Sequence, residues 1–438
     1  MNLIKRIPTY AVVAGSAWIS RIISAALQIL IIRLLTDVLS ASEYAYFVLL
    51  TSLTGWYNLS SFGVGYSLQN YISELRAKGE DYRAYISTAC LIVTAWLIIL
   101  VFLLYTASTQ FAPTYLKQFD FLTNELKINN FFIVGIFGIV AGITGIIYNI
   151  WYSVDKGYLS SIIPAISAMI SFGSVYFLSN FSSLNDKLTL FLIVYVAPAA
   201  ILPGIFFIRT AIRSWGKGHT FQTIAFKLII KRALQFGVFG IMAAAVVQID
   251  YIIMSQNISS EQIVIYNITT KIYSIIAFVY SSVLTALWPE FTKMISNNEW
   301  IKVRHSVVKY ITFGIIFFAI SSVVLIFLMP FIVGIISPKL DIVVPVSLLV
   351  ILALYHIVRI WTDTYSMVLQ SMSDLKMMWL WTPAQIVLNG ALQFLLSKQF
   401  GIYGIVLGLI LSYLLTLGWA LPKRFLYHAK QDKAKEAN

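Results

Sequence analysis

The sequence lacks the residues on which disulfide scaffolds, metal sites and most enzymes depend. Cys90 is the single cysteine among 438 residues, so an internal disulfide is excluded and no cysteine spacing for a metal site exists. No P-loop, Ser-His-Asp set or pair of catalytic carboxylates appears either. We therefore expect a protein that is not an enzyme, with no cofactor and no metal.

Charge is scarce as well. Only 11% of the residues are charged, 59% are hydrophobic, and the mean hydropathy is +0.83, which is typical of polytopic membrane proteins. The net charge of +13 lies in short clusters between apolar runs. That distribution indicates membrane orientation and contact with anionic membrane lipids, and we expect no nucleic-acid partner.

Long apolar runs are what the sequence has in abundance. A bilayer core about 30 Å thick needs roughly 20 apolar residues per helix. Twelve segments qualify, at 9–35, 44–70, 84–106, 129–152, 158–179, 188–208, 233–255, 263–288, 307–329, 345–370, 377–397 and 401–421. The sequence thus predicts an all-α polytopic membrane protein, with about 12 transmembrane helices in two six-helix halves around a central cavity.

Lysine and arginine predict the orientation of these segments. If the N-terminus is cytoplasmic, most of the basic residues outside the apolar runs fall on the cytoplasmic side. The outer connections then hold only Lys117, Lys127, Lys187, Lys339 and Lys398. This bias favours an even number of helices with both termini cytoplasmic.

A basic stretch near the midpoint predicts the domain boundaries. We expect an N-terminal six-helix half at 1–208, a linker at 209–232, a C-terminal six-helix half at 233–421 and a cytoplasmic tail at 422–438. The linker carries apolar residues at helical spacing beside lysines, which fits an amphipathic helix on the inner membrane surface. A simple cytoplasmic linker fits equally well.

Three pairs of residues indicate an internal repeat. Ser42-Glu43 matches Ser260-Glu261 at an offset of 218, and Asp155 matches Asp374 and Pro164 matches Pro383 at an offset of 219. An offset of half the chain predicts two parallel repeats with the substrate path between them. Coincidence is the alternative.

Asp250 lies inside an apolar run. A carboxylate within the bilayer costs about 2.5–3.5 kcal/mol on insertion scales, and such a residue usually faces the bundle interior and serves a function. We predict a functional role for Asp250 in the interior of the bundle. The alternative is that it lies near the outer end of its helix and is simply hydrated.

Three basic residues in apolar segments are candidates for substrate binding. Arg21 lies near the centre of the first predicted helix, where its guanidinium offers two hydrogen bonds to a phosphate, although a structural ion pair is the alternative. Arg33 lies near the outer end of that helix, where extension of the side chain towards the interface is favoured. Lys271 follows the polar residues Asn267 and Thr270, and it either binds substrate or pairs with Asp250.

The segment 345–370 adds three titratable residues. His356, Arg359 and Asp363 are spaced to share one face of a helix. Arg359 is a candidate for substrate binding, and His356, which can titrate near neutral pH, is a candidate for proton coupling. A hydrogen-bonded bystander role for His356 and a simple Arg359–Asp363 pair are the alternatives.

Glycines and prolines within the apolar runs have structural interpretations. Gly63 and Gly65 are predicted to allow bending or close helix packing. Pro198, Pro203 and Pro383 fall inside predicted helices, which they can break or kink.

Several stretches resemble a known family. The sequence is similar to Wzx-type O-antigen flippases, in the polysaccharide transporter branch of the multidrug/oligosaccharidyl-lipid/polysaccharide exporter superfamily. The resemblance covers nearly the whole chain. It is carried by Arg33-Leu34-Leu35 through Ser42-Glu43-Tyr44, Gly63-Val64-Gly65-Tyr66-Ser67-Leu68-Gln69-Asn70, Asp250-Tyr251-Ile252-Ile253 followed by Tyr266-Asn267, and Leu287-Trp288-Pro289-Glu290-Phe291.

This resemblance implies a flippase for an undecaprenyl-diphosphate-linked oligosaccharide, the O-antigen or a related polysaccharide repeat unit. The unit would move from the cytoplasmic to the periplasmic leaflet of a bacterial inner membrane by alternating access. Coupling to H⁺ or Na⁺ is an expectation from the superfamily, and the resemblance implies Asp250 or Asp363 as the ion-coupling residue. A polysaccharide polymerase and a chain-length regulator are implied partners.

Other functions fit the sequence less well. An ion-coupled exporter of drugs or organic cations favours acids in its cavity, whereas the first helix here carries Arg21. Flippases of the peptidoglycan lipid precursor have extra C-terminal helices. A membrane glycan polymerase is expected to have a large basic outer loop, and the longest one here holds only Lys117 and Lys127. A scaffold without transport leaves the buried charges unexplained.

Overall fold

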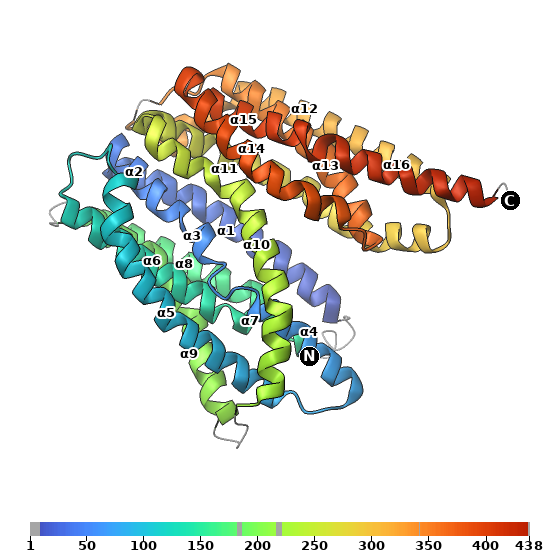
Figure 1. Cartoon of the computed structure of the whole chain (residues 1–438). Helices are drawn as coiled ribbons and strands as arrows, with labels where there is room; N and C mark the ends of the chain where they lie inside the picture. The colour runs from blue at the N-terminus through green and yellow to red at the C-terminus, as the bar shows by residue number, and fades with distance from the viewer. Residues whose placement is uncertain (1–8, 182–185, 216–220, 341, 437–438) are drawn as a thin grey trace, which may run out of the picture. The chain divides into compact units, whose positions relative to one another are not determined.

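The computed structural model describes residues 9–181, 186–215, 221–340 and 342–436, and within these ranges it contains helices and no strand. The predicted all-α class is therefore confirmed. The chain divides into two compact units, unit 1 (Met1–Ala244) and unit 2 (Ala245–Asn438), and each is described by itself (Figure 1).

Unit 1 is a bundle in which long helices pack side by side. Its helices are α1 (Thr9–Val38), α2 (Ala41–Ser52), α3 (Thr54–Tyr57), α4 (Val64–Lys78), α5 (Arg83–Tyr115), α6 (Asn124–Thr144), α7 (Ile146–Ser153), α8 (Leu159–Ser179), α9 (Lys187–Trp215) and the first part of α10 (Thr223–Asn257). α1 packs along α8, and α6 packs against both α5 and α9.

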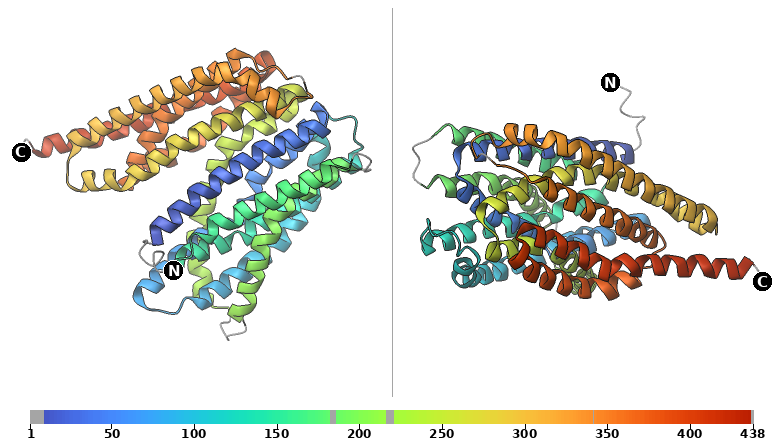
Figure 2. Two further views of the ribbon diagram at one scale, coloured as in Figure 1. Left: turned by 180° about the vertical axis from the view of Figure 1, so that it is seen from behind. Right: turned by 90° about the horizontal axis from the view of Figure 1, so that it is seen from above.

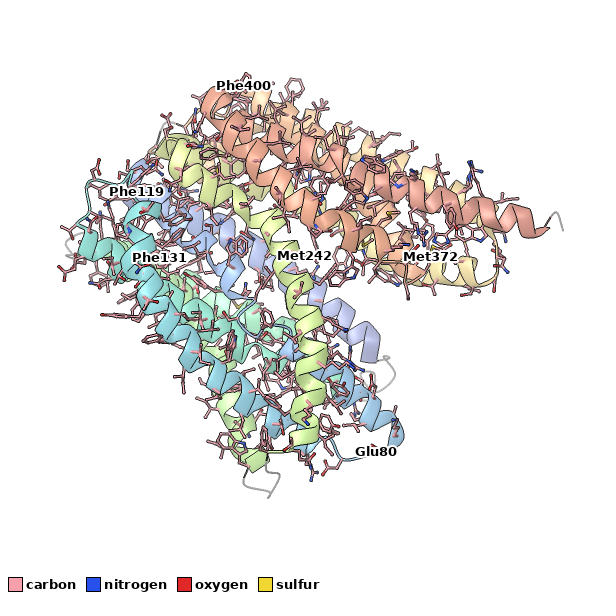
Figure 3. All side chains as sticks on the ribbon, in the orientation of Figure 1. Glu80, Phe119, Phe131, Met242, Met372 and Phe400 are labelled. Atoms are coloured by element: carbon pink, nitrogen blue, oxygen red, sulfur yellow. The ribbon has the colours of Figure 1, made fainter. Side chains whose placement is uncertain are left out.

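An aromatic cluster holds the ends of α2, α5 and α6 together. The rings of Tyr46 and Phe119 meet edge to face at 5.3 Å, and Phe131 contacts both Phe111 at 5.9 Å and Tyr115 at 6.4 Å. The Tyr115 hydroxyl donates a hydrogen bond to the Leu49 carbonyl at 3.0 Å. Phe119 and Phe131 are labelled in Figure 3. Packing these aromatic rings together, with the Tyr115 hydroxyl hydrogen-bonded, stabilises this end of unit 1.

The predicted segment 44–70 is not one helix. α2 ends at Ser52 and α4 begins at Val64, because Gly63 adopts φ +77°, a left-handed conformation that a helix does not contain. A Cβ at Gly63 would lie 2.5 Å from the Ala233 carbonyl oxygen and 2.7 Å from the Gly237 nitrogen on α10. The prediction that this glycine permits close packing is confirmed.

Unit 2 contains the rest of α10 and six further helices. These are α11 (Ser260–Ser296), α12 (Trp300–Ile336), α13 (Val346–Ser371), α14 (Lys376–Phe400), α15 (Ile402–Leu415) and α16 (Leu417–Glu436). α14 packs along α15, and α13 packs against α11 and α12 (Figure 2). The C-terminal helix α16 contacts α13 and α14.

Ten helical stretches in the described part of the chain are long and apolar enough to cross a membrane. The polytopic class follows, but the predicted count of twelve is not confirmed. The two predicted segments that do not qualify are 44–70, which is broken, and 377–397, which falls on α14. α14 buries a polar stripe at four-residue spacing, made of Gln385, Asn389, Gln393 and Ser397.

Hydrogen bonds explain how that stripe is accommodated. Asn389 Nδ2 donates to the Val246 carbonyl on α10 at 3.0 Å, and Asn389 Oδ1 accepts from Gln393 Nε2 at 2.8 Å. The Ser412 hydroxyl on α15 donates to Asn389 Oδ1 at 3.4 Å. Such bonds between apolar helices act as specific contacts where the hydrophobic effect discriminates little.

The helix boundaries support the repeat in a slightly different register. The N-cap residues of α2 and α11 are Ser40 and Ser259, and the third helical residues are Glu43 and Gln262, each of whose backbone N–H groups donates to the cap hydroxyl. The caps are 219 residues apart, so the Ser42-Glu43 match at 218 is one residue out of register. Both caps use the same chemistry of a side-chain oxygen satisfying a free N–H.

The predicted linker is not a separate helix. Residues 209–215 continue α9, residues 223–232 begin α10, and residues 216–220 lie outside the described residues. Ala225 and Ile229 are fully buried in unit 1, whereas Ile224 is 73% exposed. The domain boundaries and a membrane-surface role for this stretch stay predictions.

A half-buried carboxylate ties α16 to the turn between α13 and α14. Asp374 Oδ2 accepts hydrogen bonds from Arg424 Nε and from His428 Nε2, the second at 2.6 Å. Burial raises the pKa of Asp374, but the bonds from Arg424 and His428 outweigh burial and hold that pKa below its usual range.

We expect this carboxylate to make thermal stability depend on pH. Because the pKa of Asp374 is lower in the folded than in the unfolded chain, its contribution is present above about pH 4 and is lost as pH falls through the folded pKa. Asp374→Asn should lower the melting temperature at pH 7, and the gap to wild type should close on acidification. The measurement is thermal unfolding of both purified proteins from pH 7 down to pH 3. A difference in melting temperature that stays constant over this range would contradict a role for the ionised Asp374 carboxylate.

Candidate functional site

Unit 2 encloses a cavity of about 670 Å³, within the size range of small-molecule sites. α10, α11 and α13 supply most of its lining, with Phe318 of α12 and Leu409 of α15. Five of the seven candidate residues line it, namely Asp250, Lys271, His356, Arg359 and Asp363. The structure therefore brings together residues that lie as far as 113 positions apart in the sequence.

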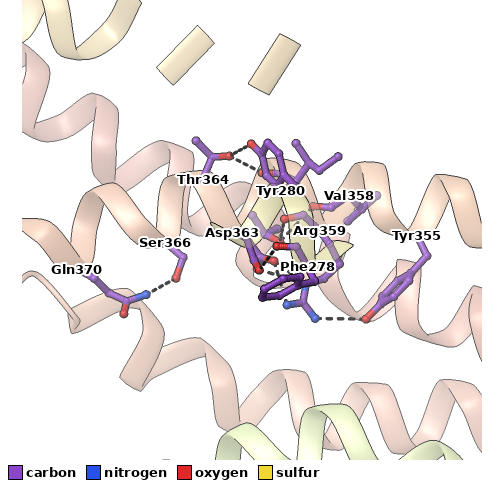
Figure 4. Close-up of polar contacts among 12 residues, drawn as sticks. Phe278, Tyr280, Tyr355, Val358, Arg359, Asp363, Thr364, Ser366 and Gln370 are labelled. Carbon is purple, nitrogen blue, oxygen red and sulfur yellow. Dashed lines mark hydrogen bonds and ion pairs between the residues drawn. The ribbon is translucent and has the colours of Figure 1, made fainter. Parts of the chain in front are cut away.

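α13 presents one polar face to this cavity. Arg359 donates to Asp363 through Nε at 3.2 Å and through one terminal nitrogen at 3.0 Å, and its other terminal nitrogen donates to the Tyr355 hydroxyl at 3.3 Å (Figure 4). The guanidinium carbon also lies 5.2 Å from the centroid of the Tyr413 ring. The predicted Arg359–Asp363 pair is thus present, and it holds the guanidinium in a defined orientation.

The cavity continues along the same helix beyond this pair. The Thr364 and Tyr280 hydroxyls are hydrogen-bonded at 2.8 Å and link α13 to α11 (Figure 4). Gln370 Nε2 donates to the Ser366 hydroxyl at 2.8 Å, and both residues line the cavity. Since neutral hydroxyl and amide groups extend from the ion pair, the site suits a ligand with both charged and uncharged polar parts.

Asp250 is 7% exposed and bound by neutral donors. Its Oδ2 accepts from the Tyr266 hydroxyl of α11 at 2.7 Å, and its Oδ1 accepts from the Tyr251 N–H at 2.8 Å. The Tyr251 hydroxyl in turn accepts from Asn267 Nδ2 at 3.0 Å. The alternative of a hydrated helix end does not describe this buried side chain.

Lys271 lies on α11 and lines the cavity. In the described part of the chain, no hydrogen bond or ion pair joins this ammonium to another residue, so the alternative of a Lys271–Asp250 pair is not observed. The Asp250 carboxylate instead accepts a hydrogen bond from the Tyr266 hydroxyl. Because Asp363 is paired with Arg359, Lys271 is the cation of this lining that has no acidic partner among the described residues.

His356 is packed among aromatic rings. Its ring stacks on Tyr273 with centroids 5.3 Å apart and on Phe318 with centroids 5.0 Å apart. No hydrogen bond to the imidazole is present among the described residues. This packing fixes one wall of the cavity, and a coupling role for His356 stays a prediction.

Arg21 and Arg33 are not part of this cluster. Both belong to α1 in unit 1, and both side chains are exposed. Neither residue lines the unit 2 cavity. Their assignment to substrate binding stays a prediction.

Sequence reasoning missed three groups that shape the cavity. Tyr266 holds Asp250, Tyr355 holds Arg359, and Tyr280 joins α11 to α13. A signal was available for Tyr355, because Tyr355, Arg359 and Asp363 recur every four residues and so share a helix face. The spacing of Asp250 and Tyr266 in the sequence does not predict their contact, because the two residues lie on different helices.

Comparison with known proteins gives close relatives in sequence. A Yersinia pseudotuberculosis protein named for O-antigen export is 35% identical over 96% of both chains. A Salmonella typhi protein named as an O-antigen transporter is 36% identical over 97% of this chain and 98% of its own. A Salmonella typhimurium protein with the same name is 32% identical over 97% and 98%. No family model matches the sequence.

Solved structures share the fold at low identity. A multidrug resistance MATE family transporter of the MOP superfamily, inward-facing, has a TM-score of 0.70 and 11% identity, and the match covers 94% of this chain and 96% of that one. The lipid II flippase MurJ, in an inward closed conformation, has a TM-score of 0.70 and 15% identity over 96% and 90%. At this identity the likeness establishes the fold alone.

Proposed function

The chain belongs to the O-antigen transporter family, and from that premise we propose that it flips an undecaprenyl-diphosphate-linked oligosaccharide across the bacterial inner membrane. The transported unit is an O-antigen or related polysaccharide repeat unit, and it moves from the cytoplasmic to the periplasmic leaflet by alternating access. The observation that supports this proposal beyond kinship is the unit 2 cavity, where the Lys271 ammonium has no partner among the described residues. Translocation makes and breaks no covalent bond, so the protein is not an enzyme.

The chemistry of this substrate matches the cavity. Its diphosphate is anionic and needs cations inside the membrane, which Lys271 and Arg359 provide as a point charge and a planar donor. The sugars are polar and need hydroxyl and amide partners, which α13 supplies beyond the ion pair. The polyprenyl tail is apolar and remains in the lipid. Arg21 and Arg33 on α1 add cations from the first half of the chain.

The competing function, export of organic cations, needs unpaired acids. Asp363 is held by Arg359, and Asp250 accepts from the Tyr266 hydroxyl. The same lining carries Lys271, whose positive charge would repel an organic cation. This arrangement favours an anionic substrate.

Asp250 is the strongest candidate for ion coupling. It is the buried carboxylate of the cavity, and its neighbours are hydrogen-bond donors that do not neutralise it. Protonation or Na⁺ binding at Asp250 would change the Tyr266 contact and thereby the link between α10 and α11. Asp363 and His356 are second candidates.

A coupling role predicts a specific behaviour for Asp250→Asn. The variant should flip at a rate that no longer changes when an imposed pH or Na⁺ gradient is removed, whereas wild type should slow. The isosteric amide keeps an acceptor for Tyr266, so folding should survive. Rates in vesicles with and without each gradient test this, and equal gradient dependence in both proteins would reject Asp250 as the coupling residue.

The remaining assignments follow from the same proposal. Both termini face the cytoplasm, and residues 1–208 and 233–421 act as the two halves that rock against each other. A polysaccharide polymerase and a chain-length regulator use the product on the periplasmic side.

Complementation tests the proposal. A host that lacks its own repeat-unit flippase but retains the matching sugar pathway should regain surface polysaccharide when it expresses this protein. The control is the same host with the protein but without the first glycosyltransferase, which should show none. Full membrane expression without restored polysaccharide would argue for another exported substrate.

A further inference from the structure

Unit 1 contains a second cavity, of about 420 Å³, with a chemistry unlike that of the first. Among the described residues, none that lines it carries a formal charge. α1, α3, α6, α7, α8 and α9 all contribute side chains to it. Its volume lies within the range of small-molecule sites.

Four hydrogen-bonding side chains line this cavity without a protein partner. They are the amides of Gln28 and Asn58 and the hydroxyls of Tyr148 and Tyr195, none of which bonds another group in the described part of the chain. By contrast, the Ser171 hydroxyl is satisfied by the Tyr195 carbonyl at 2.9 Å. The cavity thus presents several neutral donors and acceptors that are available to bind a ligand.

Aromatic faces make up another part of the lining. Tyr148, Tyr195 and Phe137 all border the cavity. The Tyr195 ring is held edge to face against Phe47 at 5.1 Å, and the Tyr148 ring packs against Trp151 at 5.9 Å. These contacts fix the two rings, so the hydroxyls are presented in set positions.

The lining excludes two parts of a lipid-linked glycan. A diphosphate would find no cation in this cavity. A polyprenyl chain would cover the Tyr148 and Tyr195 hydroxyls without offering them a partner, and each polar group left unsatisfied in this way costs about 1–3 kcal/mol. A sugar ring has hydroxyl groups around its edge and apolar C–H faces, and both match this lining.

We propose that the unit 1 cavity binds an uncharged sugar of the oligosaccharide, whereas the unit 2 cavity binds the diphosphate. This inference rests on the proposed function and adds a second site to it. Tyr148 and Tyr195 are then specificity-determining residues, because their hydroxyls contact the sugar that distinguishes one repeat unit from another.

Binding to two lipids tests the proposal. The protein in lipid nanodiscs is titrated with the intact lipid-linked repeat unit purified from the matching pathway, and separately with undecaprenyl diphosphate, which carries no sugar. Tyr148→Phe/Tyr195→Phe removes two hydroxyls and keeps both rings. A neutral hydrogen bond contributes about fivefold, so we expect about 25-fold weaker binding of the repeat unit and unchanged binding of undecaprenyl diphosphate.

Controls separate this site from the diphosphate site. Tyr176→Phe alters an exposed tyrosine of α8 that lines neither cavity, and it should change nothing. Lys271→Gln should weaken both lipids. Unchanged repeat-unit binding by the double variant, or equal weakening of both lipids, would overturn the sugar site alone. Wild type that binds neither lipid would overturn the proposed function and the sugar site together.

Discussion

Lys271→Gln is expected to reduce flipping by about 10- to 150-fold, the effect of losing one charge-assisted hydrogen bond of about 1.5–3 kcal/mol. The Lys271 ammonium lines the unit 2 cavity and has no carboxylate partner among the described residues. Its removal therefore leaves no buried group unpaired and should not destabilise the fold. The measurement is the rate at which lipid-linked repeat unit appears on the outer face of spheroplasts, at matched protein levels.

Two variants control this result. Lys271→Arg keeps the positive charge and should retain most of the activity. Lys309→Gln makes the same change on an exposed lysine of α12 that does not line the unit 2 cavity, and it should flip at the wild-type rate. Wild-type flipping by Lys271→Gln would remove Lys271 from the substrate site.

Arg359→Gln is expected to lower flipping by about 10- to 100-fold, because the guanidinium offers paired donors to a phosphate and its loss leaves Asp363 unpaired. The side chains of Arg359 and Asp363 are 29% and 42% exposed, so solvent screens the orphaned carboxylate and the stability cost should stay small. Flipping rate and melting temperature are both measured.

The double variant Arg359→Gln/Asp363→Asn decides between the two roles of Arg359. It restores the charge balance of the cavity but not the donors to substrate. If Arg359 binds the diphosphate, the double variant stays as slow as the single one. Recovery of flipping in the double variant would show instead that Arg359 serves only to neutralise Asp363.

Helix positions were largely predictable because apolar length is set by the bilayer. The predicted segment 84–106 lies within α5, and 263–288 lies within α11, with the helices extending further at both ends. Those extensions carry polar residues, as in Ser260–Gln262, where a capping serine and not hydropathy defines the start. Hydropathy therefore finds the membrane core of a helix and misses its ends.

The break between α2 and α4 could not be predicted from residue types. Gly63 and Gly65 fit either bending or close packing in a straight helix. The outcome depends on α10, whose Ala233 and Gly237 lie against Gly63. Contacts between segments about 170 residues apart are tertiary information that a single sequence does not contain.

The candidate site was predictable in part for a related reason. Placing a charged side chain in the bilayer costs free energy, so Asp250, Lys271 and Arg359 could each be identified as candidates. The same cost favours a shared polar cavity for such residues, and all three line the unit 2 cavity. Which charges pair was not predictable. The local pair Arg359–Asp363 followed from helical spacing, whereas Asp250 bonds Tyr266 and not Lys271 because neighbouring helices set that contact.

The most direct test of the account is flipping by the purified protein alone. Liposomes containing the protein and the lipid-linked repeat unit are treated with periodate, which oxidises only sugars on the outer leaflet. The account predicts that wild type makes the inner-leaflet pool accessible while Lys271→Gln, incorporated equally, leaves most of it protected. Protection as complete with wild type as in protein-free liposomes would contradict the account.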